Sequence, residues 1–190
     1  IILPNSMRSA LVARFSRATH RIGLKRQGRS MLLTHAIEPE SGEQIHTTLE
    51  DYVHLVEAII ETSAEPDELQ PRLAVTPEDQ EAASKAMNLD EGPYAVLVPG
   101  ANRQDKRWPA ECFAQLADHL VHEHGLRVAV TGSPAEQPVV QSVLDHANNT
   151  LIDLSITSMG LGGLKAILAD ASLAVTNDTG PRHIAAALDT

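Results

Sequence analysis

In the second half of the chain, short apolar runs alternate with stretches whose apolar residues recur every three or four positions. The runs have the length of buried strands, and the periodic stretches have the pattern of amphipathic helices. This alternation predicts an α/β fold with a parallel sheet and right-handed crossovers. The predicted strands are 94–98, 128–131, 151–154 and 173–176. The apolar stripe of the helix after the first strand is Phe113, Leu116, Ala117, Leu120 and Val121, and that of the helix after the second is Val140, Val143, Leu144 and Ala147. The helix after the third strand has Leu161, Leu164, Ile167 and Leu168.

The pattern of the first half of the chain predicts fewer helices and strands. Residues 1–3 and 21–24 are apolar runs of strand length, with a polar loop over residues 25–30. Ser6 can cap a helix that continues to about Ala18. The apolar stripe of this helix is Leu11, Val12 and Phe15.

The clearest amphipathic helix of the first half covers residues 45–60. His46 and His54 lie off its apolar stripe, so they do not share a face as metal ligands. The stripe consists of Ile45, Leu49, Tyr52, Val53, Val56, Ile59 and Ile60.

Residues 62–77 combine acidic side chains with Pro66, Pro71 and Pro77, which is typical of a linker. The sequence opens on a strand and stops just after a helix, so we expect it to be part of a longer protein. The expected organisation is a domain over residues 1–65, a linker with a lead-in helix over residues 66–92, and a second domain over residues 93–190.

Composition excludes several classes of protein. A net charge of −10 argues against broad binding of nucleic acid, which needs a basic face. The single cysteine, Cys112, excludes an internal disulfide, and its apolar neighbours predict a buried thiol. We see neither an apolar run of transmembrane length nor a leader pattern, which favours a cytoplasmic protein.

The opening region is locally basic within this acidic chain. A solvated surface is the simpler interpretation, and a surface for an anionic acceptor is the sharper one. Its basic residues are Arg8, Arg14, Arg17, Arg21, Lys25, Arg26 and Arg29.

Three polar turns, 99–107, 131–136 and 176–180, follow predicted strands. The carboxyl ends of parallel strands share one edge of a sheet, where ligands bind in open α/β folds. None of the turns carries the glycine signature of a dinucleotide site or a P-loop. On the first turn Lys106 can neutralise a diphosphate, and on the second Glu136 can accept hydrogen bonds from a ribose diol.

The third turn predicts a helix start. Asp178 or Thr179 can cap it, Gly180 lets backbone approach, and Pro181 suits the first helical turn. Such a start favours anions, although an ordinary capped turn is an equally good interpretation. Together with Lys106 it would suit a nucleoside-diphosphate leaving group, on which negative charge builds as the bond breaks.

Three histidines, His119, His122 and His124, gather late in one predicted helix. Favourable placement at a helix C-terminus is a better interpretation than a metal site. We therefore expect no metal.

Several short motifs are spread over nearly the whole chain. They are V-P-G-A at 98–101, K-R-W-P at 106–109, T-G-S-P-A-E at 131–136 and N-D-T-G-P-R-H-I-A-A-A-L at 177–188. With L-P-N-S-M-R-S-A-L at 3–11, R-I-G at 21–23 and the helix around 46–55, they resemble glycosyltransferase family 9. These are the ADP-heptose:lipopolysaccharide heptosyltransferases, and the chain most resembles the heptosyltransferase II type.

The resemblance implies a GT-B fold, in which two Rossmann-like domains with parallel sheets face each other; the N-terminal one would be incomplete here. It implies inverting, metal-independent transfer of heptose from ADP-heptose to an inner-core sugar of lipopolysaccharide, without a cofactor. The N-terminal domain would face a lipid-linked oligosaccharide acceptor, and the C-terminal one would bind the nucleotide-sugar donor. Peripheral contact with the inner membrane would follow from such an acceptor.

Carried over residue by residue, the resemblance implies catalytic roles for Lys106 and Asp178. Residues 154–159 would lie close to the adenine, Glu136 would hold the ribose, and Asn5, Ser6 and Arg8 would face the acceptor. The implied donor-binding residues are Asn102, Lys106, Glu136, Leu154, Met159, Asp178, Thr179, Gly180 and His183.

Two departures from the family pattern matter. The family's first strand and glycine-rich loop, which carry the proposed acidic general base, have no counterpart here, nor have the strand and loop after the final helix. We therefore expect no general base within these residues, which need not be active alone. Pro181 and Arg182 are also not the commonest residues at their positions in the family motif. The motif therefore defines the identity of the donor less well than it defines the fold.

Two alternatives stay open. A GT-B enzyme that uses a UDP-sugar would leave the same turns, because turns do not distinguish uridine from adenine. A non-catalytic module that binds a nucleotide sugar would leave them too. Competition by UDP rather than ADP favours the first, and donor binding without transfer favours the second.

Overall fold

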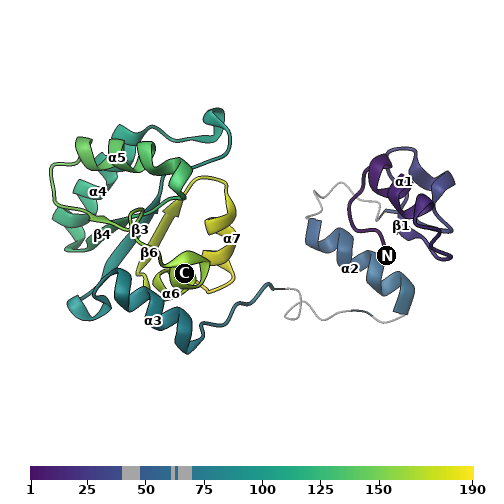
Figure 1. Cartoon of the computed structure of the whole chain (residues 1–190), viewed down its shortest axis with the longest axis horizontal. Helices are drawn as coiled ribbons and strands as arrows, with labels where there is room; N and C mark the ends of the chain where they lie inside the picture. The colour runs from purple at the N-terminus through teal and green to yellow at the C-terminus, as the bar shows by residue number, and fades with distance from the viewer. Residues whose placement is uncertain (40–47, 61–62, 64–69) are drawn as a thin grey trace. The chain divides into compact units, whose positions relative to one another are not determined.

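The computed structural model describes residues 1–39, 48–60, 63 and 70–190, which divide into two compact units (Figure 1). The first unit is Ile1–Gln70 and the second is Pro71–Thr190. Ile45 and His46, at the start of the predicted amphipathic helix, lie outside the described residues.

The second unit is built on a parallel sheet of four strands in the order β5-β4-β3-β6. The predicted α/β class with a parallel sheet is confirmed. In the register, Leu97 pairs with Val130 on one side and with Val175 on the other. The strands are β3 Tyr94–Val98, β4 Arg127–Val130, β5 Ile152–Asp153 and β6 Leu173–Thr176.

Helices cover both faces of this sheet, because side chains along β3 alternate between two cores. Tyr94, Val96 and Val98 pack on one side, and Ala95 and Leu97 pack on the other. The first face is covered by α3 Pro77–Ala86, α6 Gly160–Asp170 and α7 Gly180–Ala186, and the second by α4 Ala110–His124 and α5 Gln137–His146. Short 3-10 helices lie at Leu89–Glu91, Gln104–Lys106 and Pro134–Glu136.

The start of α3 fixes this helix to the second unit. Thr76 caps the helix and accepts from the Asp79 N–H, while Asp79 Oδ2 accepts from the Thr76 N–H at 2.9 Å. The same carboxylate pairs with Lys165 of α6 at 2.6 Å. The helix predicted as a lead-in to the second domain is thus attached to α6.

Asp79→Asn should lower the free energy of unfolding relative to the wild type, and this difference should be larger at neutral pH than at low pH. The Lys165 hydrogen bond, followed by the Thr76 N–H, holds the pKa of Asp79 below its ordinary value of 3.8. A carboxylate with a lowered pKa stabilises the fold above its unfolded pKa, and that contribution disappears as the pH falls through the folded pKa. Urea unfolding of both proteins between about pH 7 and pH 3 measures the difference. If the difference in free energy of unfolding between the wild type and Asp79→Asn does not become smaller below about pH 4, this role is contradicted.

The first unit contains a pair of parallel strands, β1 Ile22–Leu24 and β2 His35–Ile37. Its helices are α1 Met7–Phe15 and α2 Thr48–Ile60, with a 3-10 helix at Arg29–Leu32. The Ser6 cap is confirmed, since its Oγ accepts from the Ser9 N–H at 3.1 Å. The short strand β2 was not predicted.

Three predictions about this unit are wrong. Residues 1–3 form no strand, although the Ile2 N–H donates to the Ile22 carbonyl at 2.8 Å. The first helix ends at Phe15 rather than near Ala18. Its predicted apolar stripe is exposed, with Phe15 at 78% and Val12 at 65%, and the buried residue of α1 is Ala10.

Arg29 was predicted to lie on a basic surface, either solvated or facing an anionic acceptor, and this is wrong. Its side chain is fully buried, and its guanidinium donates to the carbonyls of Leu24 and Pro4 and to Asn5 Oδ1. Arg29 therefore organises the turn before α1.

Among the described residues, none of the helices has both the length and the apolar character to cross a membrane.

Candidate functional site

Two adjoining pockets lie at the carboxyl ends of the strands in the second unit, with volumes of about 450 and 570 Å³. The first, the polar pocket, is lined by the turns after β3, β4 and β6. The second, the apolar pocket, extends from the turn after β4 to the start of α6. Both are lined by Val98, Ser133, Glu136 and Pro181. The three turns singled out in the sequence thus meet at one site.

The polar pocket brings Lys106 and Asp178 together. Lys106 Nζ lies 3.1 Å from Asp178 Oδ2, and Arg182 Nη1 lies 3.2 Å from Asp178 Oδ1. The Lys106 hydrogen bond, followed by the charge of Arg182, holds the pKa of Asp178 below its ordinary value of 3.8. Asp178 is therefore an ionised acceptor between two cations at neutral pH.

The turn after β3 carries a second cation, which the sequence analysis missed. Arg103 lines the polar pocket together with Asn102 and Lys106. Its guanidinium contacts both carboxylate oxygens of Asp105, at 2.9 and 2.6 Å. Its position five residues after the end of β3 was the only available signal.

Glu136 lies between the two pockets. Ser133 donates its N–H and its hydroxyl to Glu136 Oε2 at 2.8 and 2.7 Å, which fixes the carboxylate in a capping box. A Cβ placed on Gly100 would come within 2.1 Å of Glu136 Oε1. The absence of a side chain at Gly100 therefore lets the carboxylate rest against the turn after β3.

Five of the six residues in the range 154–159, which was predicted near an adenine, line the apolar pocket; the exception is Ile156. Leu154, which is fully buried, lines this pocket together with Met159 and Leu164. A flat apolar ring with a few polar edge groups suits such a lining.

Asn177 holds two of the turns together, and the sequence analysis missed it. Its side chain is buried, and its Nδ2 donates to the carbonyls of Pro99 and Gly100 at 2.8 and 3.3 Å. Its Oδ1 accepts from the Trp108 N–H at 3.0 Å. Each end of the turn that carries Lys106 is therefore tied to the end of β6.

The other residues of the third turn lie at or beside the polar pocket. Thr179 and Gly180 line it. Thr179 occupies the N-cap position of α7, as predicted, but its side chain makes no capping hydrogen bond: the hydroxyl donates to the Asn177 carbonyl at 3.3 Å, and Asp178 binds Lys106 and Arg182. His183 is an exposed residue of α7 that lines neither pocket.

The residues predicted to face an acceptor lie at the start of α1 in the first unit. Asn5 is held by the buried guanidinium of Arg29 at 2.9 Å, and Ser6 caps the helix. Arg8 is exposed on the first turn of α1. These three residues lie together at the start of α1, in the first unit, whereas the pockets lie in the second unit.

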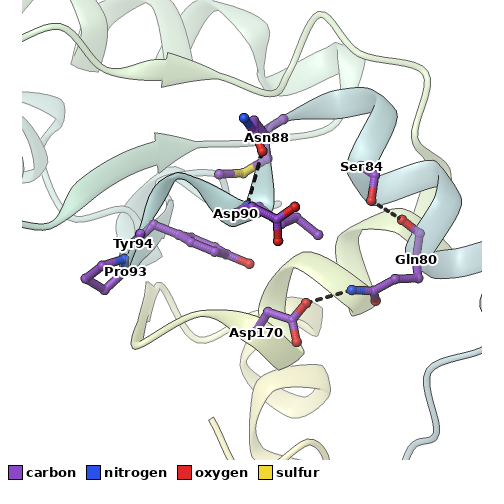
Figure 2. Close-up of a pocket in the computed structure, with 10 residues that line it drawn as sticks. Gln80, Ser84, Asn88, Asp90, Pro93, Tyr94 and Asp170 are labelled. Carbon is purple, nitrogen blue, oxygen red and sulfur yellow. Dashed lines mark hydrogen bonds between the residues drawn. The ribbon is translucent and has the colours of Figure 1, made fainter.

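A third pocket, of about 500 Å³, lies around the amino end of β3 (Figure 2). Figure 2 shows Tyr94 in this pocket together with Asp90 and Asp170, and Gln80 donates to Asp170 Oδ2 at 2.8 Å. Burial raises the pKa of Tyr94 to about 12, and its hydroxyl donates to the Ile167 carbonyl at 2.8 Å. None of the predicted site residues lines this pocket.

Within the described part of the chain, no three His, Cys, Asp or Glu side chains gather as a metal site. Two of the late-helix histidines, His119 and His124, instead face each other edge to face, with ring centroids 5.6 Å apart. Cys112 is half-buried rather than buried as predicted.

Comparison with known proteins supplies independent information. The family profile described as glycosyltransferase family 9 (heptosyltransferase) matches residues 1–190. Lipooligosaccharide heptosyltransferase 2 of Haemophilus influenzae is 30% identical over 207 residues, and lipopolysaccharide heptosyltransferase 2 of Escherichia coli is 30% identical over 197 residues. The matches cover 100% and 99% of this chain but 57% and 56% of those proteins, so the chain spans little more than half their length.

Solved structures agree in fold. The E. coli ADP-heptose lipopolysaccharide heptosyltransferase II has a TM-score of 0.75 and 28% identity, over 97% of this chain and 58% of that one. A family 9 glycosyltransferase from Veillonella parvula has a TM-score of 0.78 and 21% identity, over 98% of this chain and 53% of that one. The predicted GT-B assignment is confirmed for the part of that fold which the chain covers.

Proposed function

The chain belongs to glycosyltransferase family 9, and from this premise we propose that the protein transfers a heptose from ADP-heptose to the inner core of lipopolysaccharide. The observation that carries the proposal is the pair of adjoining pockets, one polar with Arg103 and Lys106 among its lining residues and one apolar, which share Glu136. A nucleoside diphosphate has the same succession of parts: base, ribose and phosphates. The names of the relatives support heptose as the sugar.

Each part of the donor has a complement in the second unit. The adenine fits the apolar pocket between Leu154 and Met159, and the ribose diol can donate to Glu136. The diphosphate faces Lys106 in the polar pocket. Among the other proposed donor residues, Asn102, Thr179 and Gly180 line the polar pocket, and His183 lies nearby on α7.

The chemistry follows from this placement. An acceptor hydroxyl attacks the anomeric carbon with inversion and gives its proton to a general base that we expect outside these residues. The bond from that carbon to the phosphate oxygen breaks, so that ADP leaves with increased negative charge. Lys106 faces this charge and stabilises it as the bond breaks. Asp178 orients Lys106 and can accept a hydrogen bond from a heptose hydroxyl. No metal or cofactor is required by this scheme.

The acceptor would meet the first unit, where Asn5, Ser6 and Arg8 lie on one turn. The protein would then act in the cytoplasm, with peripheral contact with the inner membrane, because its acceptor is lipid-linked. The proposed organisation keeps an acceptor-side domain over residues 1–65 and a donor domain over residues 93–190. Residues 66–92 would be a linker and a lead-in helix, and the structure groups residues 71–92 with the second unit.

Calorimetric titration with ADP, ADP-heptose and UDP, in the presence of a chelator, tests the donor. We expect ADP and ADP-heptose to bind and UDP to bind more weakly. A preference for UDP would exclude the heptose assignment, and the absence of binding by all three would exclude a nucleotide-sugar enzyme. Release of ADP from ADP-heptose by the whole protein in the presence of the lipopolysaccharide acceptor then tests the transfer, and donor binding without release by the whole protein would indicate a binding module.

Glu136→Gln should weaken ADP binding by about three- to tenfold, since a hydrogen bond to a charged acceptor is stronger than one to a neutral amide. The loss should be smaller for 2′-deoxy-ADP, which lacks one of the two hydroxyls. Gln141→Glu, on the same helical segment but outside both pockets, is the control. An equal loss for both nucleotides would show that Glu136 acts through the turn and not through the ribose.

A further inference from the structure

Arg182 lies beside the polar pocket but has no part in the scheme above. It is the third residue of α7 and is four positions after Asp178, so its side chain returns to the turn after β6. Its Nη1 binds Asp178 Oδ1 at 3.2 Å, while Lys106 binds the other oxygen, Oδ2, at 3.1 Å. The two cations thus hold opposite oxygens of one carboxylate.

A carboxylate at this position is unfavourable for a diphosphate. The charged residues that line the polar pocket are Arg103 and Lys106 against Glu136 and Asp178, so these charges only balance, and Arg182 beside the pocket adds a third cation. Without Arg182, Asp178 would have Lys106 as its remaining partner in these ion pairs, and an incoming phosphate would compete for the same ammonium.

We propose that Arg182 is a positioning residue for the donor diphosphate: it holds Asp178 and so leaves the ammonium of Lys106 available to the phosphates. The inference rests on the proposed function, because the diphosphate belongs to the nucleotide-sugar donor. It assigns Arg182 an effect on phosphate binding that is exerted through Asp178 and not by direct contact.

The test is a double-mutant cycle in the whole protein, with dissociation constants for ADP and adenosine measured by calorimetry. Arg182→Gln should weaken ADP binding by about two- to fivefold, the size expected for an exposed ion pair, and leave adenosine binding unchanged. Arg182→Lys, which keeps the charge, should restore most of the loss. In the Asp178→Asn background, Arg182→Gln should change ADP binding by less than about twofold.

Arg14→Gln, an exposed arginine of α1 in the first unit, is the matched control and should change neither ligand. Because the pairs are exposed, the effect of Arg182→Gln on ADP should shrink at high salt.

Three results would overturn the inference. Equal weakening of ADP and adenosine would mean that Arg182 only maintains the fold. Unchanged ADP binding would mean that it has no role, and an undiminished loss in the Asp178→Asn background would mean that it contacts phosphate directly. Failure of the wild-type protein to bind ADP would overturn the proposed function as well, and is therefore distinct from these three.

Discussion

Lys106→Ala is expected to weaken ADP binding by about ten- to a hundredfold. The ammonium faces the polar pocket, and the proposed diphosphate would form charge-assisted hydrogen bonds with it. Transfer should fall further, by roughly 10²- to 10³-fold, because the same contact strengthens as charge develops on the leaving group. Calorimetry with ADP and the rate of ADP release from ADP-heptose measure the two effects.

Lys25→Ala is a matched control for this substitution. Both lysines are 47% exposed in their side chains and both bind a carboxylate, but Lys25 pairs with Glu38 in the first unit. Each variant should unfold within about 0.5 kcal/mol of the wild type, since exposed ion pairs contribute little. Equal ADP affinity for Lys106→Ala and Lys25→Ala would contradict the placement of the diphosphate.

Asn177→Ala should lower the free energy of unfolding by about 2 to 3 kcal/mol and also weaken ADP binding by about tenfold. The substitution removes three hydrogen bonds of a buried side chain and leaves the Pro99 carbonyl and the Trp108 N–H without their partner. Because these groups are the two ends of the turn that carries Lys106, the ammonium loses its fixed position. Urea unfolding and calorimetry measure the two effects.

Asn177→Asp separates the contributions of the two sides of the amide. Aspartate can still accept from the Trp108 N–H, but it cannot donate to the Pro99 carbonyl when it is ionised. It should therefore destabilise the protein as well. Asn148→Ala, an exposed asparagine that binds Asp118, is the control and should leave ADP binding unchanged. Wild-type stability in Asn177→Ala would show that the amide does not hold the turns.

Much of the second unit could be predicted because its strands are short apolar runs. The runs at 94–98 and 173–176 have the same bounds in the structure as in the prediction; β3 is an inner strand that is buried throughout, whereas β6 is at the edge of the described sheet and is only partly buried. The meeting of the three turns followed from the rule that parallel strands share a carboxyl edge. Lys106, Glu136 and Asp178 were found in this way.

Features that depend on contacts between residues distant in the chain could not be predicted from the sequence. Nothing in the local pattern distinguishes Asn177, which is buried and bonded, from the exposed Asp178 beside it. Arg29 stands in a basic stretch but is buried, because the carbonyls of Leu24 and Pro4 surround its guanidinium. The apolar residues of α1 were predicted to pack and are exposed, because periodicity predicts a face but not what covers it.

The pairing of β3 with β6 determines when this site can form. Asn177 and Pro99 are 78 positions apart, and β3 has β4 as a neighbour long before residues 173–176 have been synthesised. Contacts of such long range form late, after the cost of closing the intervening loop has been met. A nucleotide that needs both turns would therefore slow unfolding without accelerating folding, because the structure that it recognises is completed only when β6 joins the sheet.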